Sequence, residues 1–128
     1  MRQTFKKEEK LNSLKIINDL FVNGKSIMVF PFKIIYYQQP IATLFPAQVL
    51  ISVSKRKFKK AVDRNKVKRL IREAYRKNKH IIYDNLRTVD KQYAIAIMYI
   101  GDKILPYSFV EEKIMASLNR LCEQFKKE

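Results

Sequence analysis

Residue types on which catalytic and metal sites depend are rare in this chain. Its 128 residues include one histidine, His80, and one cysteine, Cys122. A single histidine excludes a histidine pair or relay for acid–base catalysis, and one histidine with one cysteine cannot form a zinc site of ordinary ligand spacing. One cysteine also excludes a disulfide bond within the chain, which fits a reducing cytosol. We therefore expect no catalytic residue in the polypeptide and no dedicated metal site.

Glycine and long apolar runs are also scarce. The two glycines, Gly24 and Gly101, leave no glycine-rich loop to cradle a phosphate group. No apolar run approaches the roughly 18 residues that suggest a membrane-spanning helix. Residues 1–10, MRQTFKKEEK, lack the apolar core of a secretory signal. These absences predict a cytoplasmic protein with no membrane partner.

Acidic residues are few beside basic ones. The chain has 27 Lys and Arg against 12 Asp and Glu, a net charge of +15 that points to nucleic acid or an anionic membrane surface. A hydrophobic content of 47% argues against wholesale disorder, and the length suits one domain. The acids are scattered, and no two-metal cluster is apparent. We expect a flexible arm over residues 1–10, with Phe5 as its candidate anchor, and a single polyanion-binding domain over residues 11–128.

One amphipathic helix is predicted from Ala61 to Lys79, AVDRNKVKRLIREAYRKNK. At about 100° per residue, one side of this helix is apolar: Val67, Leu70, Ile71, Ala74 and Tyr75. The other side is polar and mostly basic: Asn65, Lys68, Arg69, Arg72, Arg76 and Lys79. Glu73 lies at the margin of this side, and Arg64 lies near the start of the helix. Like charges at this spacing repel by roughly a few tenths of a kcal/mol per pair, which a bound polyanion would neutralise. The basic side therefore predicts contact with a nucleic-acid backbone.

Hydrophobic periodicity predicts the elements before this helix. A first helix should start after Asn12 or Ser13 and end at Asn23-Gly24, with glycine in a left-handed conformation. Residues 27–37 alternate with a period of two, but Pro31 implies an edge, a bulge or two short strands that meet there. After a loop, residues 47–54 form a strand with one wetter face.

A strand and a helix are predicted after the basic helix. Beyond a polar connection, residues 92–100 are apolar on both faces, which is typical of a central strand whose small alanines make room for a helix. Ser108 to Glu111 fits a capping box, and the helix that it starts should cover the sheet. The order is α-β-β-(β)-α-β-α, an α+β domain of two layers.

The segment ISVSKRKFKKAVDRNKVKRLIREAYR also resembles the signature of the bacterial ribonuclease P protein component, R-N-x-x-K-R-x-x-R. The pattern falls on five residues: Arg64, Asn65, Lys68, Arg69 and Arg72. The resemblance implies a ribosomal protein S5 domain 2-like fold with a left-handed β-α-β crossover through the basic helix. Pattern alone would favour a right-handed crossover.

The resemblance implies the protein subunit of an endoribonuclease that matures the 5′ end of tRNA. In that family the RNA subunit carries the active site, and the implied Mg²⁺ belongs to the RNA subunit and the substrate. The polypeptide alone is therefore expected to be inactive. The implied partners are the catalytic RNA and precursor tRNA, with no dedicated protein partner.

Two binding surfaces follow from the resemblance. RNA is expected to contact the motif and its basic neighbours: Arg64, Asn65, Lys68, Arg69, Arg72, Arg76, Lys55, Arg56 and Lys60. A cleft for the single-stranded 5′ leader of precursor tRNA is expected at Ile17, Phe21, Tyr36 or its neighbour Tyr37, Ser52 and Ser54. Aromatic stacking is worth about 1–3 kcal/mol per base and tolerates any sequence, which suits varied leaders. The two serines are explained equally well as ordinary surface residues.

Three features differ from the family pattern, and one alternative function stays open. The connection from Arg56 to Lys60 is one residue longer than in relatives, and Ile17 replaces an expected aromatic. Met98-Tyr99 stands where relatives often have arginine. The alternative is a generic RNA-binding module, such as a ribosomal or double-stranded-RNA protein, which would use the same basic face without a leader cleft. A membrane-surface protein would need exposed large apolar residues opposite the basic stripe.

Overall fold

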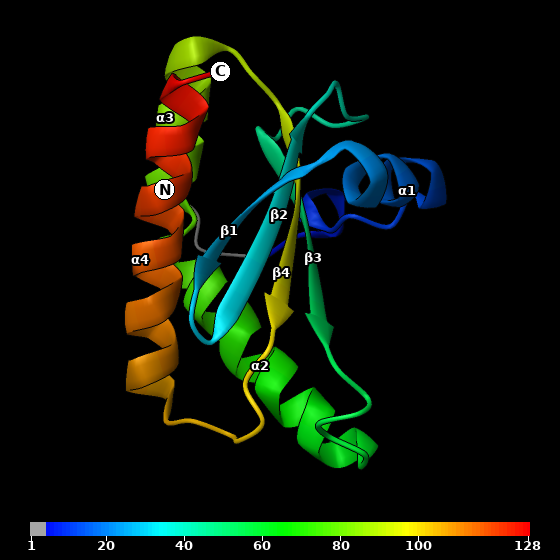
Figure 1. Cartoon of the computed structure of the whole chain (residues 1–128). Coiled ribbons are helices and arrows are strands. Elements are labelled where there is room, and N and C mark those ends of the chain that lie inside the picture. The colour runs from blue at the N-terminus through cyan, green and yellow to red at the C-terminus, as the bar shows by residue number, and fades with distance from the viewer. Residues whose placement is uncertain (1–4) are drawn as a thin grey trace.

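A four-stranded sheet with the order β1-β2-β4-β3 forms the centre of the computed structural model, which describes residues 5–128 (Figure 1). Its strands are β1 (Lys25–Val29), β2 (Phe32–Gln38), β3 (Ala47–Val53) and β4 (Tyr93–Tyr99). The pairs β1–β2 and β2–β4 are antiparallel, and β3 runs parallel to β4. Pro31 lies in the turn between β1 and β2, which confirms that two short strands meet there. β4 lies between β2 and β3, so its predicted central position is also confirmed.

Helices cover both faces of this sheet, unequally. The helical elements are η1 (Lys7–Glu9), α1 (Leu14–Asn23), α2 (Ala61–Asn78), α3 (His80–Val89) and α4 (Tyr107–Lys126). α2, α3 and α4 lie on one face, and α1 lies on the other (Figure 1). The chain passes from β3 through α2 and α3 into β4, which is the left-handed crossover that the resemblance implied. None of the described helices combines the length and the apolar character needed to cross a bilayer.

Helix α3 was not predicted, because residues 80–91 were interpreted as a polar connection. The helix buries Ile82, Tyr83 and Leu86, whose spacing brings them onto one side. Lys79 joins α2 to α3 in a helical conformation. Because neither glycine nor proline stands at this boundary, the sequence carries no sign that one helix ends and another begins. The helix ends at Asp90, which takes a left-handed φ of 54°. The signal was present as a short apolar stripe, diluted by charged neighbours.

The two faces of the sheet are packed differently. On the α2–α4 side, large residues of alternate strand positions are fully buried, among them Phe32, Ile34, Ile95 and Ile97. On the α1 side, the small residues Ala94 and Ala96 meet Leu20 and the partly buried Ile16 and Ile17. The prediction that these alanines make room for a helix is confirmed, and that helix is α1.

The ends of the helices match the predictions only in part. Ser13 caps α1, since its Oγ accepts the N–H of Ile16 at 3.4 Å. Gly24 follows α1 with a φ of −69°, so the predicted left-handed conformation is wrong. A Cβ at this position would lie 2.3 Å from the Leu20 carbonyl oxygen, so glycine is required here for close packing. α4 begins without a side-chain cap, and the predicted capping box at Ser108 is wrong.

The N-terminal segment is part of the folded domain from Phe5 onward, which corrects the expected flexible arm. Glu9 is fully buried, and its Oε1 accepts Lys79 Nζ at 2.5 Å and the Tyr83 hydroxyl at 2.7 Å. The Phe5 ring packs edge-on against Tyr75, with centroids 5.5 Å apart. A buried carboxylate needs such partners, and they fix the segment in place. The rest of the expected arm, residues 1–4, lies outside the described residues.

Candidate nucleic-acid interface

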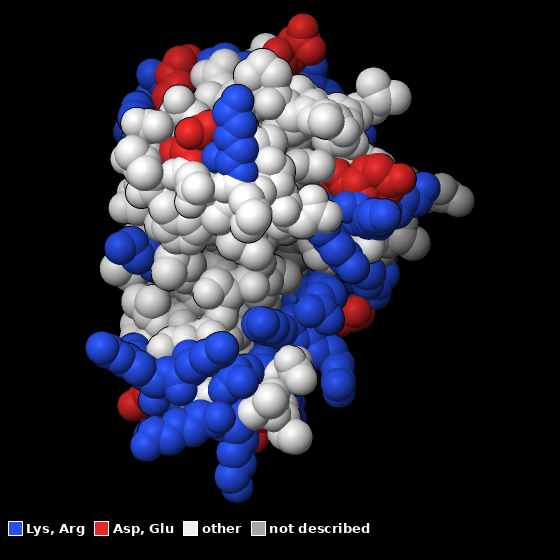
Figure 2. Space-filling view, turned by 90° about the vertical axis from the view of Figure 1, so that its right-hand side faces the viewer, with Lys and Arg blue, Asp and Glu red and all other residues white. Residues whose placement is uncertain are grey.

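The connection from β3 to α2 exposes basic side chains around one buried anchor. Lys55, Arg56 and Lys60 are exposed, whereas Phe58 is only 6% exposed and contacts the Tyr99 ring. Figure 2 shows Lys and Arg side chains gathered over the lower part of the face that carries this connection. The predicted Ser54 has a local role, because its Oγ accepts the Arg56 N–H at 3.2 Å. The connection is thus folded, and it presents its charges to solvent.

Arg64, the first residue of the motif, holds this connection in place. Its Nη1 donates to the carbonyl oxygens of Phe58 at 2.7 Å and of Lys59 at 3.0 Å. Two bonds from one guanidinium to consecutive carbonyls fix the position of the connection relative to the first turn of α2. Sequence reasoning assigned Arg64 to RNA alone and missed this positioning role.

The middle of α2 presents a row of cations, Lys68, Arg69 and Arg72, which we call the α2 basic row. Arg69 and Arg72 are exposed and Lys68 is half-buried. Opposite them the apolar side of the helix is buried, as predicted: Val67, Ile71, Ala74 and Tyr75. None of the carboxylates within residues 5–128 forms an ion pair with this row. Asn65 is also exposed and lies one turn before Arg69.

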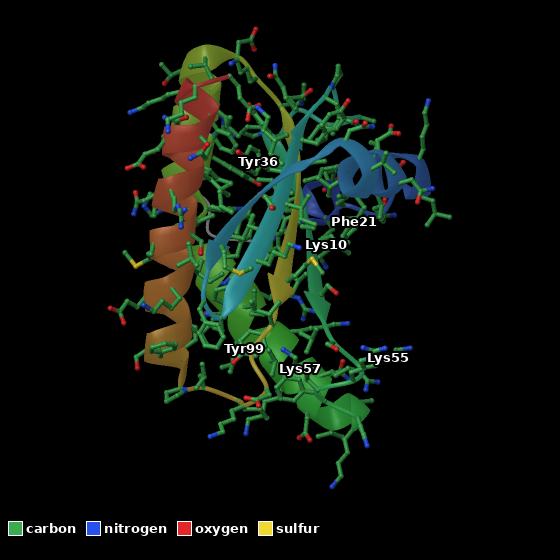
Figure 3. All side chains as sticks on the ribbon, viewed as in Figure 1. Lys10, Phe21, Tyr36, Lys55, Lys57 and Tyr99 are labelled. Carbon is green, nitrogen blue, oxygen red and sulfur yellow. The ribbon has the colours of Figure 1, made fainter. Side chains whose placement is uncertain are left out.

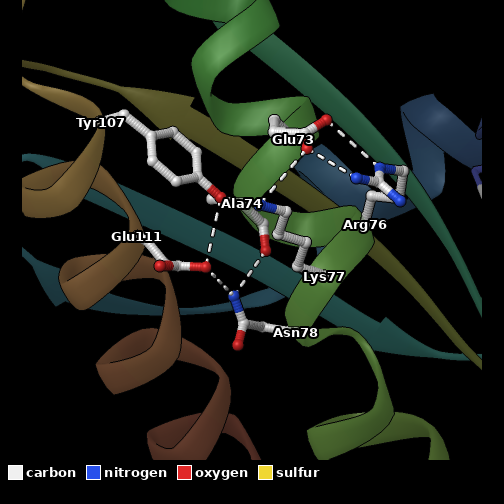
Figure 4. A network of polar contacts seen from close by, with 7 residues as sticks. All are labelled: Glu73, Ala74, Arg76, Lys77, Asn78, Tyr107 and Glu111. Carbon is white, nitrogen blue, oxygen red and sulfur yellow. Dashed lines mark hydrogen bonds and ion pairs between the residues drawn. The ribbon is translucent and has the colours of Figure 1, made fainter. Parts of the chain in front are cut away.

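Arg76 was predicted to belong to the same basic side, but its guanidinium forms an ion pair with Glu73. Its Nη2 lies 2.6 Å from Glu73 Oε1, and Lys77 Nζ lies 3.7 Å from the same oxygen (Figure 4). The hydrogen bond from Arg76 lowers the pKa of Glu73, and Glu73 in turn raises the pKa of Arg76. Beside this pair, Asn78 Nδ2 bridges the Ala74 carbonyl and the Glu111 carboxylate, which joins α2 to α4.

Lys79 was also placed on the basic side, and this is wrong. It is 4% exposed and pairs with the buried Glu9. The basic side therefore faces solvent at the α2 basic row but meets the N-terminal segment just after the helix, at Lys79. The helical periodicity of the sequence could not reveal this change, because it depends on where residues 5–10 lie in the fold.

The predicted leader residues lie on or near the α1 side of the sheet, with one exception. Phe21 is 45% exposed on α1, while Ile17 is half-buried above the alanines of β4. Strand register places one row of side chains across this side of the sheet: Met28, Lys33, Met98 and Ser52. Met28 is exposed, and the other three are half-buried.

Tyr36 is the exception, and its assignment to a leader surface is corrected. It is 3% exposed and packs on the α4 side, with its ring centroid 6.0 Å from Phe125 and 6.3 Å from Tyr93. Figure 3 shows Tyr36 and Phe21 on opposite sides of the sheet. Because strand side chains alternate, Tyr37 lies on the α1 side, where it is partly buried. The alternative aromatic at position 37 is the one that shares a side with Phe21.

The chemistry that this arrangement supports is binding of phosphate-rich strands. Within residues 5–128 no group of three or more His, Cys, Asp and Glu side chains could hold a metal ion. Guanidinium and ammonium groups without carboxylate partners are instead suited to phosphate oxygens, to which they donate charge-assisted hydrogen bonds.

Comparisons with known proteins agree with this arrangement. A family model described as Ribonuclease P matches residues 5–123. A ribonuclease P protein component of Porphyromonas gingivalis is 37% identical over 116 residues, covering 91% of this chain and 85% of the relative. One from Chlorobium phaeobacteroides is 34% identical over 134 residues, covering 96% and 88%.

Solved structures show the same fold. The RNase P protein from Thermotoga maritima superposes with a TM-score of 0.70 at 25% identity, covering 88% of this chain and 96% of that one. The RNase P protein of Staphylococcus aureus, 18% identical, shares the fold with a TM-score of 0.64 and coverage of 90% and 96%. With the family model matching most of the sequence, the chain belongs to the ribonuclease P protein family.

Proposed function

We propose that this chain is the protein subunit of ribonuclease P and binds the catalytic RNA together with the 5′ leader of precursor tRNA. The observation that carries this proposal is the α2 basic row, which stands inside the family motif without carboxylate partners in the described residues. Cations in such a row release counterions from an RNA backbone, which supplies affinity without regard to sequence.

The RNA subunit is assigned the hydrolysis of the phosphodiester bond, with Mg²⁺ bound by that RNA and by the substrate. The protein's part is electrostatic and positional. Cations at Lys55, Arg56, Lys60 and on the α2 basic row would offset repulsion between the two RNA molecules, which lowers the magnesium concentration that they need. Arg64 would keep the basic connection in register with α2 through its two carbonyl contacts.

The leader is proposed to cross the α1 side of the sheet, next to Phe21. The exposed ring of Phe21 and the partly buried Tyr37 offer surfaces on which single-stranded bases stack. Lys33 on β2 and Ser52 on β3 flank Met98 of β4 on the same side and would contact the leader backbone. The cytoplasm is the proposed compartment, supported by the free Cys122 and the nature of the substrate.

Reconstitution tests this function. The full chain is mixed with a bacterial ribonuclease P RNA and precursor tRNA, and 5′ cleavage is followed as a function of magnesium. We expect cleavage at magnesium concentrations where the RNA alone is inactive, and no cleavage by RNA-free protein. A generic RNA-binding module would bind the RNAs without lowering the magnesium requirement, and that result would overturn the proposal.

A further inference from the structure

A cavity of about 300 Å³ opens at the edge of β3, between the N-terminal segment and α2. We call it the N-terminal pocket, and the residues that matter in its lining are Phe5, Lys10, Leu50, Ile51, Lys68 and Arg72. Its volume is at the lower end of the range in which proteins bind small ligands. The buried contact between Glu9 and Lys79 fixes the segment that forms one wall.

The charges around this pocket come from two distant parts of the chain. Lys10 belongs to the N-terminal segment, while Lys68 and Arg72 are one helical turn apart on α2. No ion pair in the described part of the chain involves any of the three. Three cations that line one cavity create a site for an anion, and phosphate is one of the anions whose geometry suits a guanidinium.

The rest of the lining is suited to a base. The Phe5 ring lies 5.5 Å from Lys10 Nζ, and the side chains of Leu50 and Ile51 add apolar surface. Aromatic and apolar faces beside cations are the combination that binds single-stranded nucleic acid. A duplex could not offer an unstacked base to a cavity of this size.

The edge of β3 adds backbone groups that a nucleotide could use. The N–H of Leu11 donates to the Val49 carbonyl at 3.1 Å, after which the chain leaves the edge toward α1. Because backbone groups of alternate strand residues point to the same side, those of Ile51 face this edge as well. Among described residues no loop or side chain bonds to them. They leave a donor and an acceptor beside the pocket.

We propose that the N-terminal pocket binds one unpaired nucleotide of an RNA strand. Lys10, Lys68 and Arg72 hold its phosphate, and its base lies against Phe5 and the apolar edge of β3. This inference rests on the RNA binding proposed above and adds a subsite on the N-terminal side of the α2 basic row, at the edge of β3 rather than beside Phe21, where the leader is proposed to cross.

Fluorescence tests the base contact, because the chain contains no tryptophan. Phe5→Trp in the full chain introduces a single indole in the pocket, and Leu14→Trp places one on the exposed side of α1 as the matched control. Binding of a labelled oligouridylate is followed by anisotropy in the same titration. We expect quenching of the indole at position 5 in step with binding, and no quenching at position 14. Inorganic phosphate should compete only at far higher concentrations than the oligonucleotide.

The outcomes separate the two proposals. If the oligouridylate binds and the indole of Phe5→Trp is not quenched, the pocket assignment is overturned and the proposed function stands. If no RNA binds to the unaltered chain at any salt concentration, the proposed function fails and the inference fails with it. Quenching by inorganic phosphate at the same concentration would show a phosphate site with no base contact, which overturns the nucleotide assignment.

A second pair of variants tests the phosphate contact without altering Phe5. Lys10→Ala and Lys7→Ala change the net charge equally and lie three residues apart, but only Lys10 lines the pocket. We expect Lys10→Ala to reduce the slope of log affinity against log salt by about 0.7, and Lys7→Ala to leave it unchanged. Melting curves should match for both variants. Equal effects of the two would show general attraction by the basic surface and would overturn the phosphate contact.

Discussion

The α2 basic row and the cations that follow it along the chain are used in different ways. Lys68, Arg69 and Arg72, which form the row, have no carboxylate partner among the described residues. Beyond the row, Arg76 and Lys77 pair with Glu73, and Lys79, just after the helix, pairs with Glu9. The basic side of this helix is therefore not one functional unit. The α2 basic row is available to RNA, and the cations from Arg76 to Lys79 are held in ion pairs within the protein.

The largest expected effect comes from the buried end of the helix. Lys79→Ala leaves the Glu9 carboxylate buried without its cation, which should cost about 3–5 kcal/mol in the free energy of unfolding. Urea denaturation measures this loss. The affinity of the folded fraction for RNA should keep its salt dependence, because Lys79 does not face solvent.

The control for this variant removes both charges at once. Glu9→Leu combined with Lys79→Met keeps the volume and leaves no buried ion, so most of the lost stability should return. A loss below about 1 kcal/mol for Lys79→Ala alone would contradict the stabilising role assigned to Lys79.

A smaller effect is expected on the α1 side of the sheet. Phe21→Ala should weaken the holoenzyme's preference for precursor over mature tRNA by about 1–3 kcal/mol, because one stacked base is lost. Val22→Ala is the matched control, since Val22 is the next residue of α1 and is 79% exposed. If Phe21→Ala remains folded and discriminates as the unaltered chain does, the leader does not contact Phe21.

The smallest effect should follow from freeing Arg76 and Lys77. Glu73→Gln removes the partner of Arg76 and Lys77, so RNA affinity should become more salt-dependent, by at most about 0.7–0.9 in slope for each cation released. Glu112→Gln, an exposed acid on α4, is the control for the change in net charge. Equal slopes for both variants would show that Glu73 does not restrain these cations.

The ion pair of Glu73 also predicts a small dependence of stability on pH. Its pKa is lowered in the folded state, chiefly by the hydrogen bond from Arg76. The carboxylate therefore stabilises the fold above its unfolded pKa, and this contribution disappears as the pH falls through the lower folded pKa. The difference in melting temperature between the unaltered chain and Glu73→Gln should accordingly vanish in acid. A difference that persists at low pH would argue against an ionic origin.

Sequence periodicity predicted the parts of this molecule that depend on neighbours in the chain. The buried side of α2, the central strand β4 and the alanines under α1 all follow from local spacing and residue size. The family motif identified the α2 basic row. The left-handed crossover came from the resemblance alone, because general handedness favours the opposite hand.

The errors share one physical origin, which is contact between distant segments. Alternation shows that Tyr36 and Tyr37 lie on opposite faces of β2, but it does not show which face meets α1 and which meets α4. Lys79 and Glu9 are 70 positions apart, so helical periodicity could not show that the Lys79 side chain is buried. Arg72 and Arg76 share one side of the helix, and only the position of the Glu73 side chain separates their roles.

The most direct test of this division compares Arg72→Ala with Arg76→Ala in the full chain. Both substitutions remove one guanidinium, and the two residues lie one helical turn apart. The measurement is the salt dependence of binding to ribonuclease P RNA, with a melting curve for each variant. We predict that Arg72→Ala lowers the slope of log affinity against log salt by about 0.7–0.9 at an unchanged melting temperature, and that Arg76→Ala leaves the slope unchanged. Equal losses of slope in the two variants would contradict this division, because Arg76 would then bind RNA as the α2 basic row does.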